Sequence, residues 1–184
     1  MKTKFAVLCV AIVAMSAPML IAGSKDPMVG GAAMYASKDI IDNAVNSKDH
    51  TTLVAAVKAA GLVDTLKGPG PFTVFAPTNE AFAKLPAGTV ETLLKPENKE
   101  MLTKILTYHV VAGRISAAEL KKQIREGNGQ AALKTVSGGT LIAMLQGSSL
   151  VLKDEKGGMS TVTIPNVFQS NGVIHVVDAV VLPN

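Results

Sequence analysis

The stretch that most constrains the fold is residues 71–86, with the sequence PFTVFAPTNEAFAKLP. Thr73, Val74 and Phe75 alternate polar and apolar side chains of β-branched and aromatic types, which is typical of a strand with one buried face. Pro77 stops this strand, because proline fixes φ and has no backbone N–H for a sheet. Thr78 can then cap a short helix, so a buried strand is expected to turn directly into a helix.

This strand-to-helix corner is open to two interpretations, an active-site elbow or a corner of the core. Residues 72–85 contain no Ser, Cys or His. The corner Ala-Pro-Thr-Asn also lacks the glycines of a phosphate loop or a nucleophile elbow. The structural interpretation is therefore favoured.

Three segments, taken in order, resemble the motifs of fasciclin domains. Residues 73–82, TVFAPTNEAF, are similar to the first signature box, and residues 108–110, YHV, to the central Tyr-His pair. Residues 171–178, NGVIHVVD, with the VLP of residues 181–183, are similar to the second box. The resemblance covers about residues 37–183.

The resemblance implies an α+β fold, a β-sandwich or wedge of antiparallel and mixed strands with several helices packed over it, in a domain at residues 37–184. In animal fasciclin repeats, the pair that matches Tyr108 and His109 is tied both to core integrity and to binding of cell-surface receptors. The positions that match the family motifs, with a structural or interaction role, are Thr73, Phe75, Pro77, Thr78, Asn79, Tyr108, His109, Asn171, Gly172, His175 and Asp178.

Residues 1–22 have the order of a secretory signal peptide. Lys2 and Lys4 precede an apolar run that ends at Ala22, where small residues begin. Cleavage is expected after Ala22 or Gly23, which would make the protein secreted, periplasmic or attached to the cell surface. The alternative is an uncleaved anchor, because an apolar run of this length can just span a bilayer.

Loss of this leader changes the charge and the cysteine content. Without Lys2 and Lys4, 16 basic residues remain against 14 acidic ones, so the formal net charge falls from +4 to +2. The single cysteine, Cys9, leaves as well, and it lacks the preceding small residues of a lipoprotein site. No run of Lys or Arg alternates with aromatic residues, so no nucleic-acid partner is expected. The mature chain should need no disulfide and have no stable membrane insertion.

Residues 23–36, GSKDPMVGGAAMYA, follow neither the helical nor the strand period. Two interpretations stay open for this segment. It is either a flexible Gly- and Ala-rich tail or a strap in which residues 28–29 and 34–35 dock on the domain.

The rest of the first half is expected to be helical, and the last third to be an antiparallel sheet. Apolar residues at helical spacing predict that residues 40, 41, 44 and 45 face the core, and that a second helix begins at Thr51 or Thr52. Strand-like runs separated by glycine-containing turns lie at residues 130–135, 140–146, 150–153, 160–164 and 173–182.

The sequence around His109 and His175 suggests where each side chain points. His109 follows an apolar helical segment, so it is expected to point inward and either act as a base or tie the helix end to a neighbouring strand; the tie is favoured. In the last strand, alternation places His175 on one face with Val173 and Val177. We expect this face to be the less buried one, and His175 to be structural or idle.

The sequence offers no pattern for catalysis, for a metal site or for a cofactor. His50, His109 and His175 lie far apart, and no Walker loop, dinucleotide fingerprint or nucleophile elbow is present. Residues 177–180, VDAV, differ from the acidic, aspartate-centred motifs that are reported for integrin recognition in animal members of the family. Recognition of an integrin is therefore not expected.

Three functions from different classes remain. The first, implied by the resemblance, is a non-catalytic adhesion or interaction module for attachment, matrix or biofilm contacts. Its partner would be a cell-surface or matrix protein or a polysaccharide, and weak self-association is a further expectation. The second is a carrier of an apolar ligand such as a carotenoid or lipid. The third, a hydrolase, has no constellation to support it.

Overall fold

The computed structural model describes residues 26–184 as nine strands and nine helical segments. The predicted signal peptide lies outside these residues. The α-helices are α1 (Ile40–Ala44), α2 (Thr51–Ala60), α3 (Val63–Lys67), α4 (Asn79–Ala83), α5 (Thr89–Leu93), α6 (Lys99–Tyr108) and α7 (Ala117–Glu126), with the 3-10 helices η1 (Lys48–His50) and η2 (Pro96–Asn98). The strands are β1 (Met28–Val29), β2 (Ala32–Ala33), β3 (Phe72–Pro77), β4 (Val110–Ala112), β5 (Gln130–Lys134), β6 (Thr140–Gln146), β7 (Ser149–Lys153), β8 (Met159–Gln169) and β9 (Gly172–Val177).

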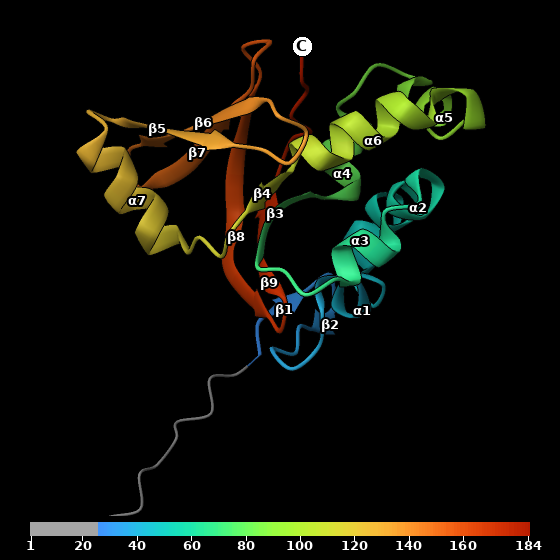
Figure 1. Ribbon diagram of the computed structural model, residues 1–184, viewed down its shortest axis with the longest axis horizontal. Helices are drawn as coiled ribbons and strands as arrows, with labels where there is room; N and C mark the ends of the chain where they lie inside the picture. Colours follow the sequence, from blue (N-terminus) through green and yellow to red (C-terminus); the bar gives the residue numbers. More distant parts are fainter. Residues whose placement is uncertain (1–25) are drawn as a thin grey trace, which may run out of the picture.

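One seven-stranded sheet forms the centre of the described chain, in the order β4-β3-β9-β8-β7-β6-β5 (Figure 1). β3 and β9 pair in parallel and the other neighbours pair antiparallel. The sheet curves so far that Val111 of β4 pairs with Thr135, just past β5, which almost closes a barrel. The predicted α+β fold is confirmed, with the expected sandwich realised as a single sheet bent back on itself.

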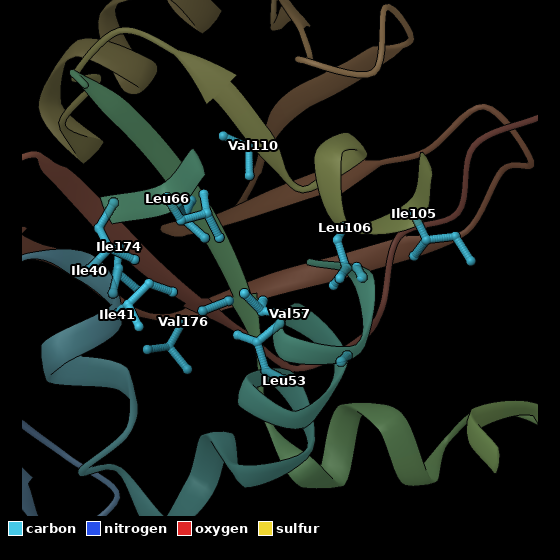
Figure 2. Close-up of a cluster of buried hydrophobic side chains, with 14 of the residues drawn as sticks. Ile40, Ile41, Leu53, Val57, Leu66, Ile105, Leu106, Val110, Ile174 and Val176 are labelled. Carbon is cyan, nitrogen blue, oxygen red and sulfur yellow. The ribbon is translucent and has the colours of Figure 1, made fainter. Parts of the chain in front are cut away.

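Two apolar cores lie on opposite faces of the β3–β9 pair. On one face, α1, α2, α3 and α6 pack their apolar side chains against Val110, Ile174 and Val176 (Figure 2). On the other face, Phe75 and Val177 lie inside the curved sheet, whose open side α7 covers with Leu120 and Ile124. β9 is consequently buried along its whole length.

Local sequence signals account for the helix ends. Asp39 accepts a hydrogen bond from the Asp42 backbone N–H, and Thr78 accepts one from Ala81, as N-cap side chains do. Gly61 ends α2 with φ +73°, a left-handed conformation that suits glycine. In α1, however, Val45 is exposed and Asn43 is buried, so the predicted assignment of Val45 to the inner face is wrong.

The last two strands differ from their predicted bounds. β8 continues beyond residue 164 to Gln169, and two register shifts around Ile164 accommodate Pro165 within the strand. β9 stops at Val177 rather than at residue 182. Its parallel neighbour β3 ends at Pro77, so the residues that follow keep a partner only on the β8 side, where the Asp178 N–H donates to the Thr161 carbonyl at 3.1 Å.

Residues 27–35, which we call the strap, lie against the domain in the structure, as in the docked one of the two interpretations. β1 and β2 form a hairpin, with Val29 and Met34 buried and Met28 and Tyr35 exposed. The Asn43 side chain accepts a hydrogen bond from the Tyr35 N–H at 3.0 Å and donates one to the Tyr35 carbonyl at 2.8 Å. Among residues 26–184, no helix combines the length and the apolar character needed to cross a bilayer.

Candidate functional site

The structure brings the three motif segments together in the middle of the sheet. Phe75 of β3 lies opposite His175 of β9 in the parallel register, and their rings stack with centroids 5.6 Å apart and planes 26° apart. The Phe75 N–H donates to the His109 carbonyl at 2.9 Å. All three side chains are buried, so the motifs meet in the core and not in an open cleft.

His109 forms two hydrogen bonds that require a neutral ring. Its Nδ1 donates to the Ile105 carbonyl at 2.8 Å, and its Nε2 accepts the Val181 N–H at 3.1 Å. Burial lowers the pKa of His109 from 6.5 to about 4, although the Asp154 carboxylate acts in the opposite direction. The inward placement expected for His109 is observed, but its ring ties the end of α6 to the segment after β9 instead of to a strand.

The expectation that His175 lies on a less buried face is wrong. Its side chain is fully buried, because β9 is central and both of its faces are covered. Nε2 donates to the Ile115 carbonyl at 2.9 Å, and Nδ1 accepts the Asn166 N–H at 3.2 Å. Burial lowers the pKa of His175 as well. His175 thus links β9 to the loop before α7 and to the bulged part of β8.

Tyr108 points into the curved sheet and holds two loops with its hydroxyl. The hydroxyl donates to the Thr140 carbonyl at 2.7 Å and accepts the Glu155 N–H at 3.2 Å. Burial raises the pKa of Tyr108 to about 12. The hydroxyl therefore stays protonated at neutral pH and serves as a connector between the β5–β6 and β7–β8 turns.

The first box supplies further backbone contacts. Thr73 donates to the Gly113 carbonyl at 2.6 Å and accepts the Ile115 N–H at 2.9 Å, while Pro77 is buried at the end of β3. Asn79 caps the N-terminus of α2, a role that its position after Thr78 in the sequence did not predict. Its Oδ1 accepts the Thr52 N–H at 3.0 Å and its Nδ2 donates to the Lys48 carbonyl at 2.8 Å, so it caps α2, which has no N-cap side chain of its own.

Replacing Asn79 with alanine should lower the free energy of unfolding by about 1–2 kcal/mol, the usual cost of losing a helix cap. Urea unfolding at neutral pH measures the change. Glu80→Ala is a matched control, because Glu80 is exposed and adjacent. An equal effect of the two substitutions would show that the cap across to α2 is not a stabilising contact.

The second box runs along β9 and reaches both ends of the β3–β9 pair. Asn171 accepts the Ile40 N–H at 3.1 Å and donates to the Leu66 carbonyl at 2.7 Å, which joins α1, α3 and the turn before β9. At Gly172, a Cβ atom would lie 2.3 Å from the Phe72 carbonyl oxygen, so no larger residue fits. Asp178, which is half-buried, accepts the Thr161 N–H at 2.7 Å.

Several buried polar residues escaped the sequence analysis, among them two groups on the strap side of the domain. Asn43 and Gln169 hydrogen-bond to each other and connect the strap to β8. His50, 3% exposed, lies 2.9 Å from the Ser47 hydroxyl through Nδ1. The burial of Asn43 could have been predicted, because it lies three residues after Ile40 and therefore on the same helix face. Nothing in the sequence near His50 distinguished it from a surface residue.

The hydrogen bonds of the motif side chains limit the proton transfer and metal binding in which these side chains could take part. In His109 and His175, both ring nitrogens are engaged with the backbone, so neither is free to take a proton from a substrate. Among residues 26–184, no group of three or more His, Cys, Asp or Glu side chains is placed to hold a metal ion. The motif residues act as connectors between segments distant in sequence.

A model of the fasciclin domain matches residues 48–183. The chain belongs to the fasciclin family. Protein sll1483 of Synechocystis is 48% identical over 163 residues, which span 86% of this chain and 81% of that protein. The immunogenic protein MPB70 of Mycobacterium bovis is 39% identical over 76% of this chain and 66% of its own length.

Two further similarities extend the comparison. The cell surface glycolipoprotein MPB83 of Mycobacterium bovis is 32% identical over 91% of this fasciclin chain and 79% of its own. The solved structure of a FAS1 domain pair from the insect cell adhesion molecule fasciclin I superposes with a TM-score of 0.70 at 20% identity. That match covers 79% of this chain and 51% of the insect chain, and it confirms the fold.

Proposed function

We propose that this fasciclin protein is an exported adhesion or interaction module that carries no catalytic centre and binds through its outer loops and strand edges. The observation that carries the proposal is the engagement of the motif side chains. The polar side-chain atoms of Tyr108, His109 and His175 form hydrogen bonds with backbone groups inside the domain. Recognition of a partner is therefore left to residues on the surface.

The relatives support an envelope setting. The fasciclin family is a family of non-enzymatic adhesion domains. One mycobacterial relative is named a cell surface glycolipoprotein. The partner that fits is a cell-surface or matrix protein or a polysaccharide, in attachment or biofilm contacts.

The alternative, a carrier of a carotenoid or lipid, has less support. The apolar cavity between the helices and β3–β9 has a volume of only about 40 Å³. A carotenoid is far larger than this space. Such a ligand would have to displace the strap and part of the helical core, so the adhesion role is preferred.

Tyr108→Phe separates a core role of the motif from a recognition role. Loss of two hydrogen bonds to the hydroxyl should lower the free energy of unfolding by about 1–3 kcal/mol. The immobilised protein should still bind cells and extracellular matrix of the organism that produces it, when attachment is measured well below the melting temperature. The matched control for stability is Tyr35→Phe, because the Tyr35 side chain is exposed and its hydroxyl should not contribute to the free energy of unfolding.

Two results would contradict the proposal. Attachment lost in a Tyr108→Phe protein of unchanged stability would place recognition at the motif itself. A wild-type protein that captures no component from the host's envelope or matrix would remove the interaction role.

A further inference from the structure

One side of the sheet formed by β5, β6 and β7 packs against no helical core among residues 26–184. Leu133, Leu141 and Leu152 point to the other side, into the core that α7 closes with Leu120 and Ile124. No side chain of these three strands belongs to the core beneath α1, α2, α3 and α6 in the described part of the chain. Figure 1 shows α7 directly below the three strands, with the other helices gathered on the right.

Strand register identifies the residues on this uncovered side. Side chains that alternate with Leu133, Leu141 and Leu152 point outward, and residues paired across neighbouring strands share a side of the sheet. The apolar residues selected in this way are Ala132, Ile142, Met144, Val151 and Met159, and the basic residues are Lys134 and Lys153. We call this set the outer face.

The outer face is apolar and partly open to solvent. Met159 is 51% exposed, Ile142 and Met144 are half-buried, and Val151, opposite Met144, is buried. Apolar side chains that gather on a surface with polar residues around them typically mark a site for a protein or a membrane. The outer face is therefore a candidate interaction surface.

The side chains that extend from this surface are positively charged. Lys134 and Lys153 are exposed, and so is Lys156 in the turn that joins β7 to β8. Among residues 26–184, none of these lysines forms an ion pair. The carboxylates of the same turn are held against the backbone, where Asp154 and Glu155 each accept two or more N–H groups. The exposed ammonium groups therefore favour an anionic partner.

The residue types favour a lipid surface over a protein partner. Protein interfaces are enriched in aromatic residues and Arg and are depleted in Lys, whereas the outer face combines Lys with aliphatic residues and Met. A lysine can lay its stem along apolar surface and place its ammonium group at a lipid phosphate. The apolar side chains beside it then enter the boundary between headgroups and acyl chains.

We propose that the outer face is a peripheral docking site for an anionic lipid bilayer. Met159, Ile142 and Met144 lie at the headgroup boundary, and the lysines of the face bind the lipid phosphates. Docking is reversible, because only a few apolar side chains enter the lipid. This inference goes beyond the adhesion role, which needs no lipid, so either can fail without the other.

Sedimentation with lipid vesicles tests the proposal on the exported protein. Vesicles of phosphatidylglycerol and phosphatidylcholine in equal parts should bind it at least about tenfold more tightly than vesicles of phosphatidylcholine alone, since each lysine near an anionic surface adds up to about fivefold. Raising the salt concentration to the physiological range should weaken this binding, because salt screens exposed charges.

Charge variants locate the contact. Lys134→Gln combined with Lys153→Gln should weaken binding to the anionic vesicles about tenfold. Lys95→Gln combined with Lys99→Gln is the matched control, because it removes the same charge from exposed positions on the helical side of the domain. The control pair should keep most of the wild-type affinity.

A second pair of variants tests the apolar contact. Met159→Ser should weaken binding to the anionic vesicles several-fold, because an apolar side chain no longer enters the lipid. Met101→Ser is the matched control, since Met101 on α6 is 57% exposed and Met159 is 51% exposed. All variants share residues 1–25, so differences among them report on the outer face.

Three results would overturn the proposal. Absence of binding to the anionic vesicles, or equal affinity for the two kinds of vesicle, would remove the lipid site. Equal losses in the outer-face variants and their controls would place the contact elsewhere. Outer-face variants that lose an acidic protein partner but keep vesicle binding would assign the face to a protein. The comparison of the two lipids on the wild-type protein stands even if a variant fails to fold.

Discussion

Acidification from pH 7 to pH 5 is expected to lower the free energy of unfolding by at least about 2 kcal/mol, through the buried histidines. The pKa of His109 falls from 6.5 to about 4 in the folded protein because burial penalises the charged ring. The unfolded chain therefore takes up a proton below pH 6.5, while the folded protein stays neutral down to about pH 4. Stability is complete above pH 6.5 and is lost as the pH falls through this window.

His175 and His50 add to the effect in the same direction, because burial lowers the pKa of each. Protonation of His175 would place a proton on Nδ1, which faces the Asn166 N–H; protonation of His109 would place one on Nε2, which faces the Val181 N–H. In both cases a hydrogen bond must break. Glu155, whose pKa lies below its ordinary value, loses its contribution only at lower pH.

Urea unfolding at pH 7, 6 and 5 measures this dependence. His109→Gln is the informative variant, because it does not titrate and its side-chain oxygen can accept the Val181 N–H. For this variant, the free energy of unfolding should fall by about 1.2 kcal/mol less between pH 6 and pH 5 than it does for the wild type. Stability independent of pH over this range would contradict the neutral, buried state of the three rings.

His109→Ala should lower the free energy of unfolding by about 2–4 kcal/mol at neutral pH. The substitution leaves the Val181 N–H and the Ile105 carbonyl without the ring and creates a cavity between the end of α6 and the chain terminus. For a domain of this size, the melting temperature should fall by about 5–15 °C. Thermal unfolding followed by circular dichroism provides the measurement.

Lys134→Ala is a suitable control, because Lys134 is exposed on β5 and should change stability by less than about 0.5 kcal/mol. His109→Gln should recover part of the loss by restoring one hydrogen bond. A His109→Ala protein as stable as the wild type but unable to bind its partner would contradict the core role and place His109 in recognition.

Much of the fold could be predicted from local sequence. Thr78 after Pro77 determines where β3 ends and α4 begins, because the proline removes a ladder donor and the threonine caps the helix. The glycine-containing turns determine the antiparallel order from β5 to β9. Apolar periodicity also placed α2 and the inward direction of His109. These features depend on residues a few positions apart, which a sequence displays directly.

The chain by itself thus determined the helix and strand boundaries of its central motifs, the family and the inward placement of His109. Only the tertiary structure decided that β3 pairs in parallel with β9, that His175 is enclosed on both sides, and that the strap covers a cavity containing His50. The physical reason is distance along the chain. Alternation in β9 shows which residues share a face, but whether each face is covered depends on helices such as α1 and α7, which lie far away along the chain.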